Sequence, residues 1–183
     1  NSGMDLEGFK GIFWFEYAHR LLGRSIGMIF LIPMIYFWIR KKIDRKLAPK
    51  LVAMFVLGGL QGLLGWYMVK SGLISAPHVS QYRLTAHLGL AFVIYAYIFW
   101  VAVGLLFPED APKGQGGGAG LRKFSYIISG LLFVTVLSGG FVAGLKAGLA
   151  YNTFPLMGGR WVPEGFLSLE PVWRNFFEDV TTV

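Results

Sequence analysis

Hydrophobic and polar positions along this chain fall into long, separate blocks. Three stretches carry no charged residue: Leu51 to Val69, Leu84 to Phe107 and Phe124 to Leu145. A fourth apolar stretch, Tyr17 to Ile39, has ionisable residues only near its start. Roughly 20 apolar residues in a helix cross a bilayer core of about 30 Å, and each stretch is about that long. The pattern therefore predicts four transmembrane helices, at about residues 13–39, 51–69, 84–107 and 124–145.

The composition agrees with this prediction. The 183 residues are 55% hydrophobic and 15% charged, and the mean hydropathy is +0.55. About a quarter of the residues are charged in a typical soluble domain, so these values argue against a water-soluble globule. We expect an all-α, multi-pass membrane protein in which the four transmembrane helices form an antiparallel four-helix bundle.

Basic residues gather in two of the connecting segments. The segment from Arg40 to Lys50 holds six of them against one acid, and Pro108 to Lys123 holds three more. Short loops rich in Lys and Arg stay on the inner side of a membrane, so the N-terminus and the tail, residues 146–183, are predicted to face outward. The net charge is +7, but the basic residues lie between apolar runs, and no nucleic-acid partner is expected.

Glycines recur at the spacing that lets membrane helices approach closely. Gly58 and Gly62 form one such pair, and Gly140, Gly144 and Gly148 repeat the spacing near the end of the last apolar stretch. We expect helix contacts at these positions.

Four ionisable residues lie close together in the first predicted helix: Glu16, His19, Arg20 and Arg24. Residues three apart share a helix face, so Glu16 and His19 point the same way. An ionised side chain at the membrane centre costs roughly 2.5 to 3.5 kcal/mol and usually faces a partner inside a bundle. The simpler interpretation is an interfacial charge cluster, in which the arginines reach the membrane surface and Glu16 pairs with Arg20.

A second histidine, His87, lies near the start of the third predicted helix. The first and third helices run in the same direction, so His19 and His87 are expected at similar depths on diagonal helices. The chain has no cysteine. Two imidazoles suit the axial ligation of a haem better than a zinc site or a carboxylate-bridged iron pair, which need more ligands. Each histidine could instead be structural, bonded to a backbone carbonyl, and His78 is expected in a solvated loop.

Other residues near these histidines could serve a haem. Its propionates could pair with basic side chains near the outer boundary, namely Arg20, Arg24 and Arg83. Room for the porphyrin could come from small residues, namely Gly23, Gly27 and Gly89. Glu16 lies about one turn outward from His19, where a carboxylate could relay protons, and a salt bridge is the alternative role.

Several longer motifs of the chain resemble the haem A synthase family, of the mitochondrial and alphaproteobacterial type. They include Glu16-Tyr17-Ala18-His19-Arg20 with Gly23-Arg24, and the run from Leu60 to Leu73. The similarity continues through Val79 to Gly89, Gly139 to Leu145 and Tyr151 to Gly158. Together these motifs span most of the chain.

The resemblance implies a membrane oxidoreductase that converts haem O to haem A, by oxidising the C8 methyl group to a formyl group, for use in cytochrome c oxidase. In the family's pattern His19 and His87 match the ligands of the substrate haem, and Glu16 matches a required carboxylate. The family has eight helices in two similar halves, and the other half would hold a haem b cofactor. Another bacterial branch carries paired cysteines, so their absence favours the mitochondrial type. The mitochondrial inner membrane is then expected, with the bacterial cell membrane as the alternative.

The resemblance also implies that this chain is the N-terminal, haem-binding half of a longer protein. One helix of the family would precede Asn1 and the second half would follow Val183, so we do not expect the fragment alone to complete the redox cycle. The implied partners are haem O, membrane lipid, a haem O synthase, an electron donor such as ferredoxin, and a second copy of the chain.

Two other functions stay open on the residues alone. A bis-histidine membrane cytochrome b that only transfers electrons would use His19 and His87 but would not need Glu16. A structural or assembly membrane protein without a cofactor would need none of the three.

Overall fold

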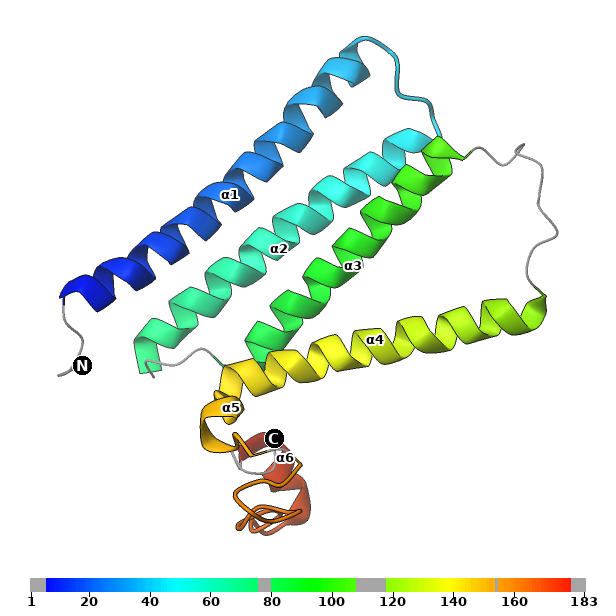
Figure 1. Ribbon diagram of the computed structural model, residues 1–183. Helices are drawn as coiled ribbons and strands as arrows, with labels where there is room; N and C mark the ends of the chain where they lie inside the picture. The colour runs from blue at the N-terminus through cyan, green and yellow to red at the C-terminus, as the bar shows by residue number, and fades with distance from the viewer. Residues whose placement is uncertain (1–5, 76–79, 108–117, 154, 179–183) are drawn as a thin grey trace.

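The computed structural model describes residues 6–75, 80–107, 118–153 and 155–178. Four long helices dominate it (Figure 1): α1 (Leu6–Ile39), α2 (Leu47–Ser75), α3 (Gln81–Leu106) and α4 (Ala119–Leu145). All four are long and apolar enough to cross a membrane. Within the described residues the only β-type pairing is an isolated bridge between Met157 and Arg160. The predicted all-α architecture with four membrane-crossing helices is therefore confirmed.

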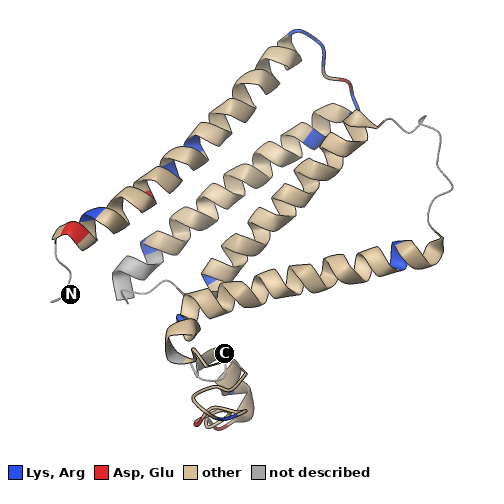
Figure 2. Ribbon diagram, viewed as in Figure 1, with Lys and Arg blue, Asp and Glu red and all other residues tan. Residues whose placement is uncertain are grey.

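All four helices begin earlier than the apolar stretches that predicted them. The stretches were bounded by charged residues, but Lys, Arg and Glu are good helix formers and continue a helix beyond its apolar part. The start of α2 shows what does set a boundary. One carboxylate oxygen of Asp44 accepts the backbone N–H groups of Lys46 and Leu47, at 3.0 and 2.5 Å, and so caps the first turn. Most charged side chains lie near helix ends, in loops and along the N-terminal half of α1 (Figure 2).

The helices pack in chain order and alternate in direction. Contacts join α1 to α2, α2 to α3, and α3 to α4, and among the described residues none joins α1 to α4. Figure 1 shows α4 diverging from the other helices toward its N-terminal end, so the bundle is open on one side.

The crossing of α3 and α4 depends on two of the predicted glycines. A Cβ atom on Gly140 would lie 2.8 Å from the Thr85 hydroxyl oxygen, and one on Gly144 would lie 2.6 Å from the Cα atom of Gln81. These contacts confirm the prediction for Gly140 and Gly144. It was wrong for the other glycines, Gly58, Gly62 and Gly148, where a Cβ would meet no described residue within 4 Å.

After α4 the chain forms a small packed segment with α5 (Ala147–Ala150), the 3-10 turn η1 (Val172–Arg174) and α6 (Asn175–Glu178). Asn175 is fully buried and bonds three backbone groups, of Leu169 twice and of Val172 once, at 2.7 to 2.9 Å. The Tyr82 hydroxyl on α3 donates to the Phe176 carbonyl at 2.5 Å. The described part of residues 146–183 is thus folded and attached to the start of α3.

Candidate functional site

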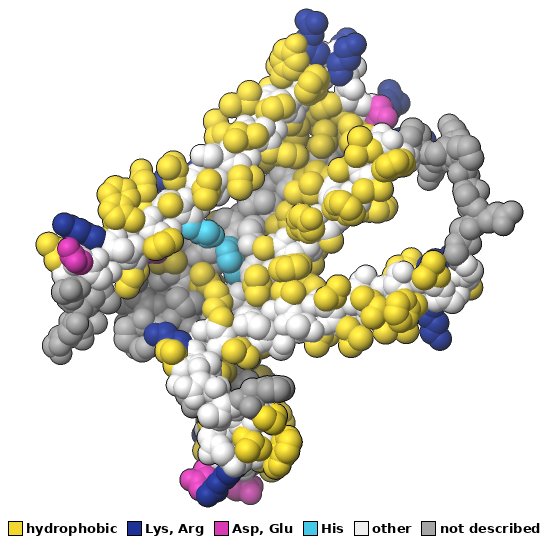
Figure 3. Space-filling view, in the orientation of Figure 1, with side chains coloured by type: hydrophobic (Ala, Val, Ile, Leu, Met, Phe, Trp, Pro, Cys, Tyr) yellow, Lys and Arg dark blue, Asp and Glu magenta, His cyan; other side chains and the backbone are white. Residues whose placement is uncertain are grey.

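The two described histidines lie on parallel helices at matching depth. His19 precedes the end of α1 by 20 residues, and His87 precedes the end of α3 by 19. Figure 3 shows the histidine side chains next to each other between α1 and α3. His78 lies outside the described residues.

Helix α2 fixes the position of His87 from one side. The Gln61 side-chain amide donates to the backbone carbonyl of His87 at 2.9 Å, and the same nitrogen lies 3.4 Å from Nε2 of the imidazole. One turn further along α2, Gly65 leaves the space that the ring fills, since a Cβ there would lie 3.0 Å from His87 Cε1. An amide and a glycine of α2 therefore hold and accommodate the imidazole.

Three buried polar atoms around this position have no hydrogen-bond partner among the described residues: Nδ1 of His87, Oε1 of Gln61 and the hydroxyl oxygen of Thr85. A buried polar atom without a partner costs roughly 1–3 kcal/mol, so such atoms usually indicate a ligand, a water or an ion. Two of the three belong to the His87–Gln61 pair. The site therefore has hydrogen-bonding atoms that no described group of the protein satisfies.

The acidic and basic residues of α1 lie beside this site. Glu16 forms an ion pair with Arg20, with side chains that are 47% and 51% exposed. The salt bridge considered from the sequence is therefore present, and the carboxylate remains accessible. Arg24, one turn further along, is exposed. Arg83 packs its guanidinium over the ring of Tyr67, 5.1 Å from the ring centre.

The residues present fit a haem. Two neighbouring imidazoles, of which His87 has an unpartnered ring nitrogen, would hold the iron of a haem, whose porphyrin would supply the other ligands. No group of three or more His, Asp or Glu side chains able to hold a bare metal ion occurs in the described part of the chain. On α1, Gly23 and Gly27 have open space beside them, as a flat ring requires. The expectation for Gly89 was wrong, because Gly89 is buried with Leu137 of α4 placed 2.9 Å from where its Cβ would be.

Two residues of the site, Gln61 and Gly65, were not predicted. Gln61 is the one amide in the otherwise apolar stretch from Leu51 to Val69. A polar side chain within a membrane span normally has a partner inside the protein, and that rule was the available signal. Gly65 carries no comparable signal, because its role depends on which face of α2 meets His87.

Comparison with known proteins agrees with the site. The chain is 61% identical over its whole length to a protein of Nitrosospira multiformis called "Heme A synthase", covering 51% of that protein. Proteins of the same name from Nitrosomonas eutropha and Rhodospirillum centenum are 59% and 51% identical, with 52% and 48% of their lengths covered. The chain thus spans about half the length of the curated relatives that it matches.

No solved structure gives a significant match to the chain. The model of one protein family, by contrast, matches all of residues 1–183. Its description is "Cytochrome oxidase assembly protein", and it is named COX15-CtaA. The chain is therefore a member of this family of cytochrome oxidase assembly proteins.

Proposed function

We propose that this chain is the haem-binding half of a haem A synthase, an oxidoreductase that converts haem O to haem A by oxidising the C8 methyl group to a formyl group. The supporting observation is the neighbouring pair of His19 and His87, with the accessible carboxylate of Glu16 one turn from His19. The name shared by relatives with 47% to 61% identity supports the same reaction.

His19 and His87 would hold the iron, and Gln61 and Gly65 would keep the His87 ring in place. The haem held there would be the substrate haem O, and the oxidation of its methyl group would need an oxidant such as dioxygen from outside the protein. Glu16 would hold or accept a proton at the edge of the site, because its carboxylate lies one turn from His19 and is about half exposed. Arg24 and Arg83, together with Arg20, would pair with the propionates. Because Glu16 already engages Arg20, Arg24 is the arginine of α1 better placed for this role.

The rest of the reaction cycle would depend on sequence beyond this half. The relatives are about twice as long as the chain, and we propose that their other half holds a haem b that carries electrons. A haem O synthase, an electron donor such as ferredoxin and a second copy of the protein are further proposed partners.

The location follows from the relatives, which come from bacteria. The bacterial cell membrane is therefore the proposed location, and the relatives do not support the mitochondrial inner membrane.

The test is extraction of the haems from the full-length protein. Glu16→Gln removes the carboxylate and keeps its shape, so we expect haem O to accumulate at the expense of haem A while haem absorption is retained. Glu7→Gln, an exposed acid at the start of the same helix, is the matched control and should leave haem A formation unchanged. Unaltered haem A formation in Glu16→Gln would remove Glu16 from the mechanism. Haem b as the sole pigment of the unmodified protein would favour a cytochrome that only transfers electrons.

A further inference from the structure

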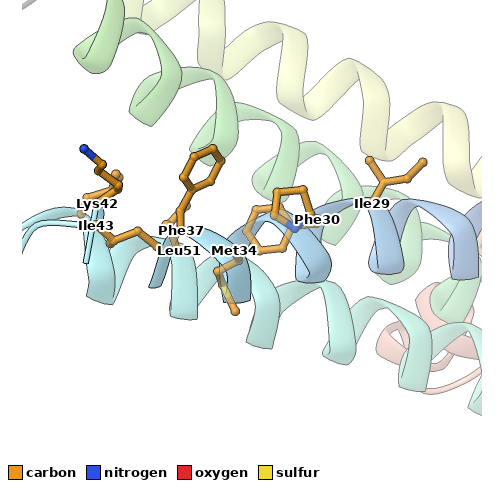
Figure 4. A pocket seen from close by; sticks show the side chains of 9 residues that line it. Ile29, Phe30, Met34, Phe37, Lys42, Ile43 and Leu51 are labelled. Atoms are coloured by element: carbon orange, nitrogen blue, oxygen red, sulfur yellow. The ribbon is translucent and has the colours of Figure 1, made fainter. Parts of the chain in front are cut away.

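An apolar space lies between α1 and α2, where the second half of α1 faces the start of α2. It is a cavity of about 410 Å³ lined on α1 by Ile29, Phe30, Met34 and Phe37, and on α2 by Leu51. Figure 4 shows these side chains in a row along the two helices, with Lys42 at one end. Ile29 is ten residues beyond His19, about 15 Å along the helix, so the cavity is separate from the histidine site.

The end of the cavity that holds Lys42 is strongly basic. The connection from α1 to α2 contains Arg40, Lys41, Lys42, Arg45 and Lys46, with Asp44 as its one acid. The carboxylate of Asp44 is occupied in capping α2. The two ion pairs found in the described residues, Glu16–Arg20 and Arg160–Glu164, involve none of these cations. The positive charge at the cavity mouth is therefore not balanced by a described acidic partner.

We propose that this cavity binds an anionic phospholipid, with an acyl chain along the apolar wall and the phosphate group at Lys42. An apolar groove that ends in a cationic rim matches both parts of such a molecule. Basic pockets between membrane helices on the inner side are a recurring site for anionic headgroups, and the loop of residues 40–46 is on the predicted inner side. A hydrocarbon chain would also fill the space between α1 and α2, next to the side chains of Met34 and Phe37.

The chain provides a matched pair of variants for testing this. Lys42→Gln removes a positive charge from a residue that lines the cavity. Lys41→Gln removes a positive charge from the preceding residue, which does not line it. Met34→Trp fills the cavity without changing any charge. The full-length protein would be purified in detergent and mixed with phosphatidylglycerol or phosphatidylcholine, and the bound lipid would be counted by native mass spectrometry.

We expect phosphatidylglycerol to be retained in preference to phosphatidylcholine. Lys42→Gln should weaken its retention about fivefold, which is the typical effect of one lysine at an anionic surface. Lys41→Gln should have a much smaller effect, and Met34→Trp should weaken retention of both lipids. Inorganic phosphate should not displace the lipid.

Three results would overturn the proposal. Equal losses in Lys41→Gln and Lys42→Gln would mean that the loop acts only through its overall charge. Equal retention of the two lipids would exclude recognition of the phosphate by Lys42. Absence of bound lipid from the unmodified protein in the mass spectra would show that the cavity is not a lipid site.

Discussion

The contact between Gln61 and His87 makes the sharpest prediction about the site. Gln61→Met keeps the length and volume of the side chain and removes both of its polar contacts with His87. Because the shape is kept, no cavity forms, and the change in free energy reports the lost polar interactions. We expect the imidazole of His87 to lose its fixed orientation and haem to be held less tightly.

The magnitude follows from the geometry. The bond from Gln61 to the His87 carbonyl is 2.9 Å long, whereas the approach to Nε2 is 3.4 Å and contributes less. The carbonyl also accepts the helical N–H four residues on, so it is not left unsatisfied. A hydrogen bond between membrane helices contributes about 0.6 kcal/mol on average and at most about 1.7. The expected loss is therefore about 1 kcal/mol, a factor of roughly five in haem retention.

The assay measures haem absorption per protein after purification, and thermal unfolding of the haem-free protein as a second readout. Leu63→Met on the same helix is the control, because Leu63 is 62% exposed. Retention, absorption spectrum and reduction potential that all match the unmodified protein would refute the idea that Gln61 positions His87. A fall in unfolding temperature without any change in haem binding would leave Gln61 only a role in joining α2 to α3.

Two further predictions concern packing, at the crossing of α3 and α4 and in the segment after α4. Gly144→Ala should destabilise the protein by about 1–3 kcal/mol, because the new Cβ would lie 2.6 Å from the Cα atom of Gln81, and backbone cannot move aside as a side chain can. Thermal denaturation measures this loss of stability. Gly148→Ala is the control and should be neutral, because there is open space around Gly148. Asn175→Ala should loosen the segment after α4 by about 2 kcal/mol or more, because it leaves buried backbone groups of Leu169 and Val172 without their partner. Faster hydrogen exchange at residues 169–175 is the expected readout, and unchanged exchange would contradict it.

The helices could be predicted from the sequence because lipid imposes a simple rule. Every backbone group in the membrane needs an internal partner, so a long apolar stretch such as Leu84 to Phe107 can only be a helix. Successive helices alternate in direction, so the first and third helices run the same way, and this placed His19 and His87 at one depth. The length of each span and its direction were therefore enough to predict a shared depth for the two histidines.

Contacts that depend on helix rotation could not be predicted in this way. Gly58 and Gly62 have the same spacing as Gly140 and Gly144, yet only the second pair faces another helix. Gly89 was expected beside the haem but packs against Leu137, because α4 crosses α3 on that face. Spacing shows which residues share a face, whereas the neighbour that this face meets is decided by all four helices together.

The two ligand candidates are supported very differently. Helix α3, which carries His87, is packed by α2 through Gln61 and Gly65 on one side and by α4 through Gly140 and Gly144 on the other. Helix α1, which carries His19, has close backbone contacts with α2 and with no other described helix. His87 is therefore the fixed member of the pair, and His19 the one whose position depends on how α1 rests on α2. Since the described helices α1 and α3 have no backbone contact of their own, an iron held by both imidazoles would join them directly. Binding of haem would then contribute to the packing of α1 as well as to the reaction.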